Sequence, residues 1–406
     1  MSSERLYYTD PYLMEFDAVV RDVVRDGDRW RVTLDRTAFY PTSGGQPFDT
    51  GVLDQAKVIE VVDEQDGSVV HVIDRELEKN SRVRGHIDWS RRFDHMQQHT
   101  GQHLLSAAFE HVVAARTLSF HLGTSSSTID LDKELSPEQI ADVESEANRV
   151  LWEDREVCVR FVTAAEAAKL PLRKDPARTG ELRIIEIKDY DLSACGGTHV
   201  RRTGGIGVIA IAGFERFKGG QRVEFVCGGR TLRSYRSLKT AINGSVRLLS
   251  VLPDELPQAI EKLQKAARDQ QKSQEALYER LAGHEAEALI AKGEKIGPTT
   301  IVAEAVSGWD AAGLKKLASA IVMAPSTFAV LITTEVPTLA VLSRSQDLPI
   351  DAGAVLRKLI EQFGGKGGGK GAMAQGGGLN GAAAEILAAA RDEAVRLLST
   401  GEPPMQ

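Results

Sequence analysis

The runs His99-Thr-Gly-Gln-His103 and Cys195-Gly-Gly-Thr-His199 are the stretches around which this chain has to fold. The first lies in residues 93–115, which contain no Pro and only one Gly, and whose apolar residues recur at helical spacing. Residues four apart on a helix share a face, so both imidazoles can point toward one metal ion. The first run therefore predicts half of a metal site on a helix.

The second run supplies the other half. Cys195 and His199 are also four residues apart, and we expect Gly196-Gly197 to let the chain wrap so that both side chains face inward. Three imidazoles and one thiolate suit tetrahedral Zn²⁺. We therefore predict one Zn²⁺ per chain, held by His99, His103, Cys195 and His199.

A metalloprotease of the H-E-x-x-H type is the main alternative for the first run. Its mechanism needs a Glu beside the first His as general base, and this chain has Thr100 there. Peptidase activity is therefore not expected.

Other His and Cys residues have open roles. His95, four residues before His99, and His121 are each either a proton shuttle or ligand orienter, or a structural histidine. Cys158 and Cys227 lie in apolar runs and are expected to be small core residues.

The N-terminal segment predicts β structure. Short β-rich runs at 18–20, 30–34, 58–62 and 69–73 are typical of a small barrel or sandwich. Between them lies the loop 38–47, which contains Gly44, Gly45 and Gln46 and is too aromatic and polar for a mere linker.

The middle segment predicts an α+β domain. A helix is expected from a cap at Ser136 to about Trp152, followed by strands at 157–162, 182–187, 206–211 and 222–227. We place the end of this domain near Leu238.

The C-terminal part begins with a heptad-like pattern. Apolar, Gln and His residues fall four and three apart, which favours a weak coiled coil or a helical hairpin. These positions are Leu256, Ile260, Leu263, Ala267, Gln270, Gln274, Leu277, Leu281, His284 and Ala288. Strands are expected at 328–333 and 338–342. The Gly-rich run 364–378 carries Lys366 and Lys370 but lacks the spacing of a phosphate-binding P-loop, so either a flexible linker or a phosphate contact is expected.

Composition limits the class of protein. The 406 residues, 42% hydrophobic and 26% charged, indicate a globular protein of two to four domains. The N-terminus does not resemble a secretory signal, no apolar run is long enough to span a membrane, and three scattered Cys favour a reducing cytoplasm. The net charge is −7, yet residues 196–236 hold eight Lys/Arg against two acids, which indicates either a phosphate-binding surface or a solvated face.

At this point the motifs resemble a known family. The two metal runs are similar to those of the alanyl-tRNA synthetase editing domain and of its free-standing relatives, the AlaX proteins. The loop Phe39-Tyr-Pro-Thr-Ser-Gly-Gly-Gln46 resembles the barrel segment that precedes those domains, and the run 364–378 resembles their C-terminal DHHA1-type domain. Because the chain starts at the barrel, it resembles the long form of AlaX rather than a synthetase. It departs from the family at Gly205, where a Glu is common.

The resemblance implies a four-part α+β architecture. The parts are a small β-barrel (1–88), a zinc-containing α+β editing domain (89–238), a helical hairpin or coiled-coil linker (239–296) and a glycine-rich α/β C-terminal domain (297–406). The C-terminal domain is expected either to grip tRNA or to form a homodimer.

The implied function is trans-editing, the hydrolysis of serine or glycine from mischarged tRNA(Ala). His103, Cys195, Thr100 and His121 are the candidates for chemistry, and Thr117, Ser119 or Thr100 for binding the serine hydroxyl. Zinc is expected to position the substrate. The tRNA contacts are expected at Arg201, Arg202, Lys218, Arg222, Lys366 and Lys370. The alternatives are a non-catalytic tRNA-binding factor with a structural zinc and a deacylase for another mischarged tRNA.

Overall fold

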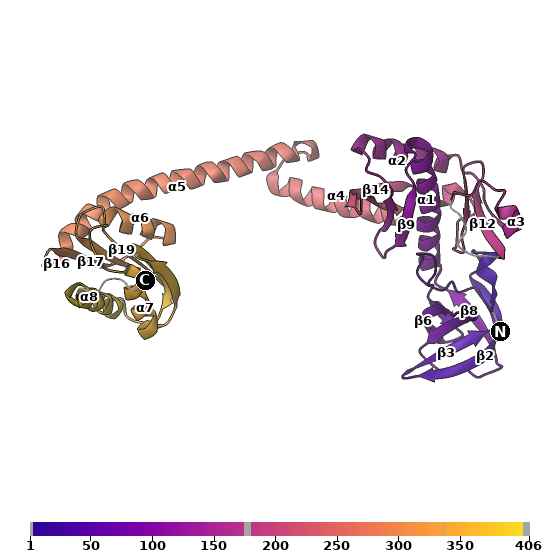
Figure 1. Cartoon of the computed structure of the whole chain (residues 1–406), viewed down its shortest axis with the longest axis horizontal. Coiled ribbons are helices and arrows are strands. Elements are labelled where there is room, and N and C mark those ends of the chain that lie inside the picture. Colours follow the sequence, from indigo (N-terminus) through magenta and orange to yellow (C-terminus); the bar gives the residue numbers. More distant parts are fainter. Residues whose placement is uncertain (1–2, 174–179, 336, 401–406) are drawn as a thin grey trace. The chain divides into compact units, whose positions relative to one another are not determined.

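The computed structural model describes residues 3–173, 180–335 and 337–400. The chain divides into two compact units, Met1–Ser245 and Val246–Gln406 (Figure 1). Within the described ranges, no helix combines the length and the apolar character that crossing a membrane requires.

Six antiparallel strands close a barrel at the start of the first unit, as predicted. Buried and exposed residues alternate along the strand Arg82–Ile87, because one face of each strand lines the barrel core. Val20, Val61 and Ile73 are fully buried in that core. In barrel order the strands are β2 (Glu15–Asp26), β3 (Arg29–Leu34), β7 (Val69–Ile73), β6 (Ala56–Asp63), β5 (Gly51–Leu53) and β8 (Arg82–Ile87). A short pair, β1 (Glu4–Arg5) and β4 (Arg36–Thr37), lies beside it.

A buried ion pair fixes the barrel to helix α1 (Trp89–Val113). The guanidinium of Arg92 bonds the Asp49 carboxylate and donates to the carbonyl oxygens of Pro11 at 2.8 Å and Ala38 at 2.5 Å. Neither charged side chain is exposed, so removing one partner would leave a buried charge, at a cost of about 3–5 kcal/mol. The loop 38–47 is thereby held against α1.

Helix α1 forms the centre of the first unit. Asp88 caps its N-terminus by accepting from the Arg91 N–H, and Ala114 ends it in the left-handed conformation. Gly101 is required in mid-helix because a Cβ there would lie 2.3 Å from the Cys227 sulfur. The residues from His95 to Phe109 are all buried, which is unusual because many of them are polar.

Two sheets and a second helix surround α1. Helix α2 (Pro137–Trp152) begins with the predicted cap at Ser136, as a capping box with Gln139. The four-stranded sheet runs β14 (Ile209–Phe217), β15 (Gly220–Cys227), β10 (Ser127–Leu131), β9 (Thr117–Leu122). The three-stranded sheet runs β11 (Val157–Thr163), β12 (Glu181–Ile187), β13 (Asp191–Ala194), with the short helix α3 (Ala164–Ala167) after β11.

Two sequence expectations in this region were wrong. The strand predicted at 206–211 starts at Ile209, because Thr203–Ile206 form a 3₁₀ turn and Gly207 has a φ of +89°. Cys227 lies in the core as expected, but Cys158, on the edge strand β11, is only half-buried.

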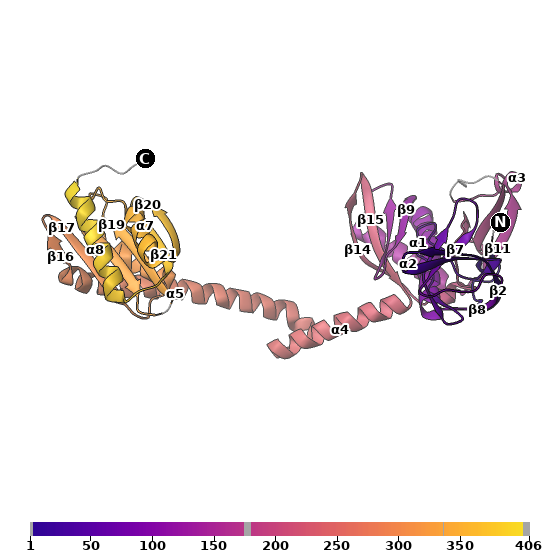
Figure 2. The same cartoon turned by 90° about the horizontal axis from the view of Figure 1, so that it is seen from below.

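The second unit is a six-stranded sheet covered on both faces. Residues of β18 point alternately to the two sides, so all seven are buried. The end of α5 and α6 pack on one face, and α7 and α8 on the other (Figures 1 and 2). The sheet order is β16 (Glu294–Ile296), β17 (Thr299–Val306), β18 (Thr327–Thr333), β19 (Thr338–Arg344), β21 (Met373–Leu379), β20 (Lys366–Lys370). The helices are α6 (Ala311–Ile321), α7 (Ala352–Phe363) and α8 (Ala383–Thr400).

The helical segment differs from its prediction. Helix α4 (Gly229–Leu249) begins inside the segment assigned to the editing domain, and α5 (Leu256–Lys292) is one helix of 37 residues. In the heptad seam, Leu263 is 59% and Leu277 is 62% exposed, whereas Ala282 and Ala286 are buried against α6. The heptad pattern therefore does not mark the face by which α5 packs in this unit.

The Gly-rich run is ordered as a hairpin rather than a flexible linker. Strand β20 pairs with β21, and a Cβ at Gly367 would lie 2.4 Å from the carbonyl oxygen of Gln375. Asp351, the cap of α7, accepts from the Gly371 N–H at 3.0 Å and ties the turn to that helix. The glycines thus permit close pairing of the two strands.

A buried histidine makes the barrel sensitive to acid. The ring of His71 bonds the Thr37 hydroxyl at 2.8 Å and the Val32 carbonyl oxygen at 3.2 Å, and burial lowers its pKa to about 4. The neutral ring is favoured in the fold, so this contribution to stability is complete above pH of about 6.5 and is lost as the pH falls toward 4. Over this range the free energy of unfolding should fall by roughly 3 kcal/mol.

Hydrogen exchange of barrel amides in the wild type and in His71→Gln, measured at pH 7.5 and pH 4.5, checks this prediction. The protection that the wild type has over the variant should shrink at the lower pH. A difference that stays constant between the two pH values would contradict it.

Candidate metal centre

Four potential ligands from two distant segments meet beside α1. His99 and His103 project from the helix, and Cys195 and His199 come from the loop after β13. Their ligand atoms all lie within 4.8 Å of one another, and the Cys195 sulfur is 3.4 Å from Nε2 of both His99 and His199. Adjacent N and S ligands of tetrahedral zinc are separated by roughly 3.5 Å, so the spacing fits that geometry.

The barrel loop orients the first histidine. Nδ1 of His99 lies 2.8 Å from Oε1 of Gln46, a fully buried side chain that also accepts from the Thr198 N–H and donates to the Thr198 hydroxyl. Because Nδ1 is engaged, Nε2 is the nitrogen left to face the cluster. One amide therefore connects the barrel, the helix and the second ligand loop.

The other two rings are oriented in the same way. Nδ1 of His103 lies 3.1 Å from the carboxylate of Asp191, and Nδ1 of His199 lies 3.2 Å from the hydroxyl of Thr100. That hydroxyl also accepts from the Val200 N–H. Thr100 therefore supports a ligand, which is one of the roles open to it from the sequence.

Glycine is needed beside Cys195 for a reason other than the expected one. Neither Gly196 nor Gly197 has a positive φ. A Cβ at Gly197 would instead lie 2.2 Å from the His99 ring. The loop can approach the helix only because residue 197 has no side chain. In the barrel loop both Gly44 and Gly45 have a positive φ, and a Cβ at Gly45 would in addition lie 2.9 Å from the Phe120 carbonyl oxygen.

The electrostatics of the cluster favour a thiolate. Burial opposes ionisation of the Cys195 thiol, but the imidazoles of His99 and His199 outweigh it and hold its pKa well below the usual range. Burial likewise disfavours a charged His103, yet Asp191 and Cys195 raise its pKa to about 9. A buried set of one thiolate and three oriented imidazoles is the donor chemistry that zinc requires, so the residues fit this metal.

Two histidines singled out in the sequence lie outside this cluster. His121 is exposed on β9, and its neighbour Phe120 is the residue that packs on the His99 ring. His95 is buried one turn before His99, with an unpartnered Nδ1 and a pKa lowered to about 3 by burial and by Arg91.

All three of the expected tRNA-binding arginines already have acidic partners. Arg201 pairs with Asp10, Arg202 with Asp154 and Arg222 with Asp130. Lys218 lies over the Phe217 ring. Lys366 and Lys370 are exposed on β20 of the second unit.

A polar group that the sequence analysis missed shares the helix face of the histidine ligands. Gln102 and Ser106 are buried, and the Ser106 oxygen accepts from the Gln102 amide at 2.9 Å and from the Thr117 hydroxyl at 2.7 Å. Oε1 of Gln102 has no partner among the described residues. Helical spacing alone contained the signal, because residues 99, 102, 103 and 106 form one stripe.

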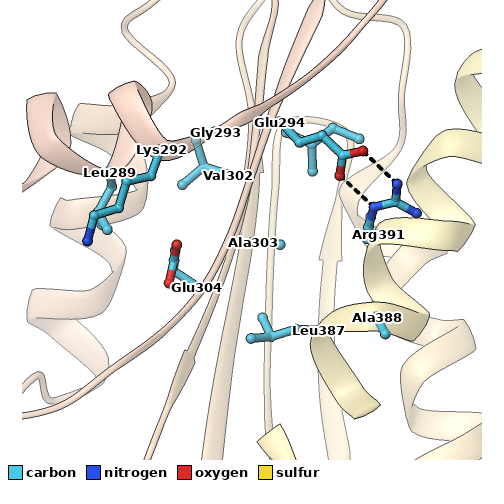
Figure 3. Close-up of a pocket in the computed structure, with 11 residues that line it drawn as sticks. Leu289, Lys292, Gly293, Glu294, Val302, Ala303, Glu304, Leu387, Ala388 and Arg391 are labelled. Carbon is cyan, nitrogen blue, oxygen red and sulfur yellow. Dashed lines mark hydrogen bonds and ion pairs between the residues drawn. The ribbon is translucent and has the colours of Figure 1, made fainter. Parts of the chain in front are cut away.

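A cleft of about 200 Å³ in the second unit offers less chemistry (Figure 3). Arg391 there forms two 2.6 Å bonds with the carboxylate of Glu294, and Leu387 and Val302 supply apolar lining. Because these charges satisfy each other and the lining holds no His or Cys, the metal cluster is the stronger site.

Three family models match this chain. Residues 8–91 match the class II (A) tRNA synthetases, residues 182–224 the threonyl and alanyl tRNA synthetase second additional domain, and residues 298–397 the DHHA1 domain. The second match contains Cys195 and His199.

Similar proteins extend along most of the chain. The alanyl-tRNA editing protein AlaX-L of Pyrococcus horikoshii is 32% identical over 92% of this chain and 94% of its own length. An alanine–tRNA ligase of Pyrococcus abyssi is 33% identical over 91% of this chain but only 41% of the ligase. The solved C-Ala domain of Aquifex aeolicus alanyl-tRNA synthetase is 22% identical over 26% of this chain and 97% of that one, with a TM-score of 0.24.

The Gln46 amide should be necessary for tight metal binding. Gln46→Ala removes the partner of the His99 ring, and loss of such outer contacts typically weakens metal affinity by about 10–100-fold. Competition with a chelator on the full chain measures the dissociation constant for zinc. The matched control is Gln98→Ala, a buried glutamine that bonds only backbone atoms of Asp94 and Cys227. Equal zinc affinity in both variants would contradict the prediction.

Proposed function

The chain belongs to the AlaX-L family of alanyl-tRNA editing proteins, and on this premise we propose that it removes serine, and also glycine, from mischarged tRNA(Ala). It is an aminoacyl-tRNA hydrolase. The serine and glycine assignment is supported by one observation. The cluster of four metal ligands shares a helix face with Oε1 of Gln102, a hydrogen-bond acceptor that has no partner among the described residues. The compartment we propose is the cytoplasm, in keeping with three unpaired cysteines.

We propose zinc as the cofactor, at one ion per chain on His99, His103, Cys195 and His199. When bound, zinc supplies a positive charge that can orient the amino group or the carbonyl group of the aminoacyl ester. The protein side chains around it set the ring orientations through Gln46, Asp191 and Thr100. Because Cys195 is the half-buried member of the set, the substrate is expected to approach from its side.

Serine would be distinguished from alanine by its hydroxyl. Thr100 is engaged with His199, and Ser119 donates to Asp130 at 2.6 Å on the exposed side of β9. The Gln102 acceptor is a better candidate, because it lacks a partner among the described residues and is buried. A site built to bond a hydroxyl discriminates strongly against the analogue that lacks it.

The tRNA itself would be bound through exposed cations on both units. Lys218, Lys366 and Lys370 are the simplest candidates. The paired arginines Arg201 and Arg202 can exchange a carboxylate for a phosphate, because exposed ion pairs contribute only about 0–1 kcal/mol. A homodimer through the second unit stays a prediction.

Deacylation of seryl-, glycyl- and alanyl-tRNA(Ala) tests the proposal. The wild type should release serine and glycine and leave alanine attached, and Cys195→Ala and His103→Ala should abolish the release because each removes a ligand. Cys227→Ala is the matched control, since this buried cysteine lies outside the cluster. No hydrolysis by a zinc-loaded wild type that binds tRNA, or activity only on another mischarged tRNA, would refute the substrate assignment.

Replacing the acceptor should change selectivity. Gln102→Leu should slow serine release about tenfold, the equivalent of one hydrogen bond, while glycine release changes little because glycine has no hydroxyl. Single-turnover rates on the two substrates give the ratio. Gln98→Leu serves as the control, because its side chain bonds the backbone of Cys227. An unchanged serine-to-glycine ratio in Gln102→Leu would exclude this recognition.

A further inference from the structure

A buried guanidinium lies behind the Cys195 loop and has no carboxylate partner in the part of the chain that the structure describes. Arg183, on β12, is only 7% exposed, and it forms no ion pair with any described residue. Its Nη2 is buried with no hydrogen-bond partner. Burying an unpaired charge is costly, so a local task for this side chain is to be expected.

Every hydrogen bond that the Arg183 side chain makes goes to a backbone carbonyl. Nη1 donates to the carbonyl oxygens of Cys195 at 2.7 Å and Gly197 at 2.9 Å, and Nε donates to that of Tyr8 at 3.1 Å. The guanidinium also lies over the Tyr8 ring, 5.4 Å from its centroid. Arg183 therefore fixes two of the peptide groups between the thiol ligand and the last histidine ligand.

Fixing a carbonyl also fixes the N–H of the same peptide group, because the two point in opposite directions across a trans peptide bond. The Gly197 carbonyl points to Arg183, and the N–H of that peptide, on Thr198, is correspondingly taken by Gln46 on the opposite side. The Cys195 carbonyl also points to Arg183, so the N–H of Gly196 must point away from it. That N–H has no partner among the described residues, and Gly196 is exposed.

We propose that Arg183 is a positioning residue that turns the Gly196 N–H toward the ester carbonyl of the bound aminoacyl-tRNA. The inference rests on the proposed function, and it adds a donor for the oxygen on which negative charge develops. Fixed backbone donors of this kind stabilise the charge that forms during acyl transfer. The lack of a side chain at Gly196 fits this role, because no side chain of that residue covers its N–H. The nearest atom to a Cβ placed there would be the Tyr8 hydroxyl oxygen, at 3.5 Å.

The reaction that this donor assists is ordinary ester hydrolysis. Water adds its oxygen to the carbonyl carbon, and the bond from that carbon to the ribose oxygen breaks. The ribose oxygen takes one proton and becomes a hydroxyl. The amino acid leaves as a carboxylate, and the second proton passes to solvent. The Gly196 N–H holds the carbonyl oxygen throughout and transfers no proton.

Arg183→Met in the full zinc-loaded chain is the first test. We expect the single-turnover rate of seryl-tRNA hydrolysis to fall about 100-fold, the usual effect of losing one such donor, with tRNA affinity unchanged. Arg183→Lys should recover part of the rate, because an ammonium can still bond one carbonyl. Arg160→Met is the matched control and should keep the wild-type rate, because Arg160 is an exposed residue of the neighbouring strand β11 and pairs with Glu186.

The spectrum of the cobalt-substituted protein separates positioning from metal binding. Arg183→Met should retain the thiolate-to-cobalt absorption and the tetrahedral bands of the wild type. Loss of the metal or of these bands would overturn the proposal, because Arg183 would then serve to build the metal site. A wild-type hydrolysis rate in Arg183→Met would overturn it as well.

Gly196 offers a test that does not depend on the stability of the Arg183 variants. Gly196→Ala and Gly196→Pro both add a side chain, but only proline removes the N–H. The proline variant should be at least about tenfold slower than the alanine variant, and equal rates in the two would overturn the proposal. A wild type that hydrolyses none of the mischarged tRNAs would instead refute the proposed function itself.

Discussion

The side-chain amide of Gln46 is the contact on which the rest of the first unit depends. It bonds the His99 ring and both the N–H and the hydroxyl of Thr198, so it joins the barrel loop, helix α1 and the second ligand loop at one buried point. Arg92 with Asp49 joins the barrel loop to α1, and Thr100 with His199 joins α1 to the second ligand loop, but Gln46 contacts all three segments at once. The barrel, which carries no ligand of its own, is thereby part of the metal centre.

Helix α1, which Gln46 contacts, buries polar side chains where most helices bury apolar ones. Its central turns are polar and buried, and several of the polar groups bond partners far away in the chain, as Gln98 bonds the backbone of Cys227. Buried polar groups hold a structure in one arrangement because each lost bond leaves an unsatisfied group. A helix of this kind is suited to hold ligands in fixed orientations rather than to contribute apolar burial.

Close backbone approach is the second constraint, and glycine meets it. Gly197 lies against the His99 ring, Gly101 against the Cys227 sulfur and Gly45 against the Phe120 carbonyl, and in each case a methyl group would overlap its neighbour. The same demand recurs in the hairpin of β20 and β21 in the second unit. Glycines at these positions therefore mark tight packing.

Local patterns in the sequence were enough to predict several features of this fold. The barrel strands and the shared helix face of His99 and His103 follow from spacings of two and four residues, and the cap of α2 at Ser136 follows from a local capping motif. Tertiary structure alone decided the rest. It gave His99 a partner 53 residues away in Gln46, paired Arg201 with Asp10, and placed Arg183 behind Cys195 with no carboxylate partner among the described residues. The physical reason is that periodicity fixes which face of an element is buried, whereas the partner found there depends on how distant segments pack.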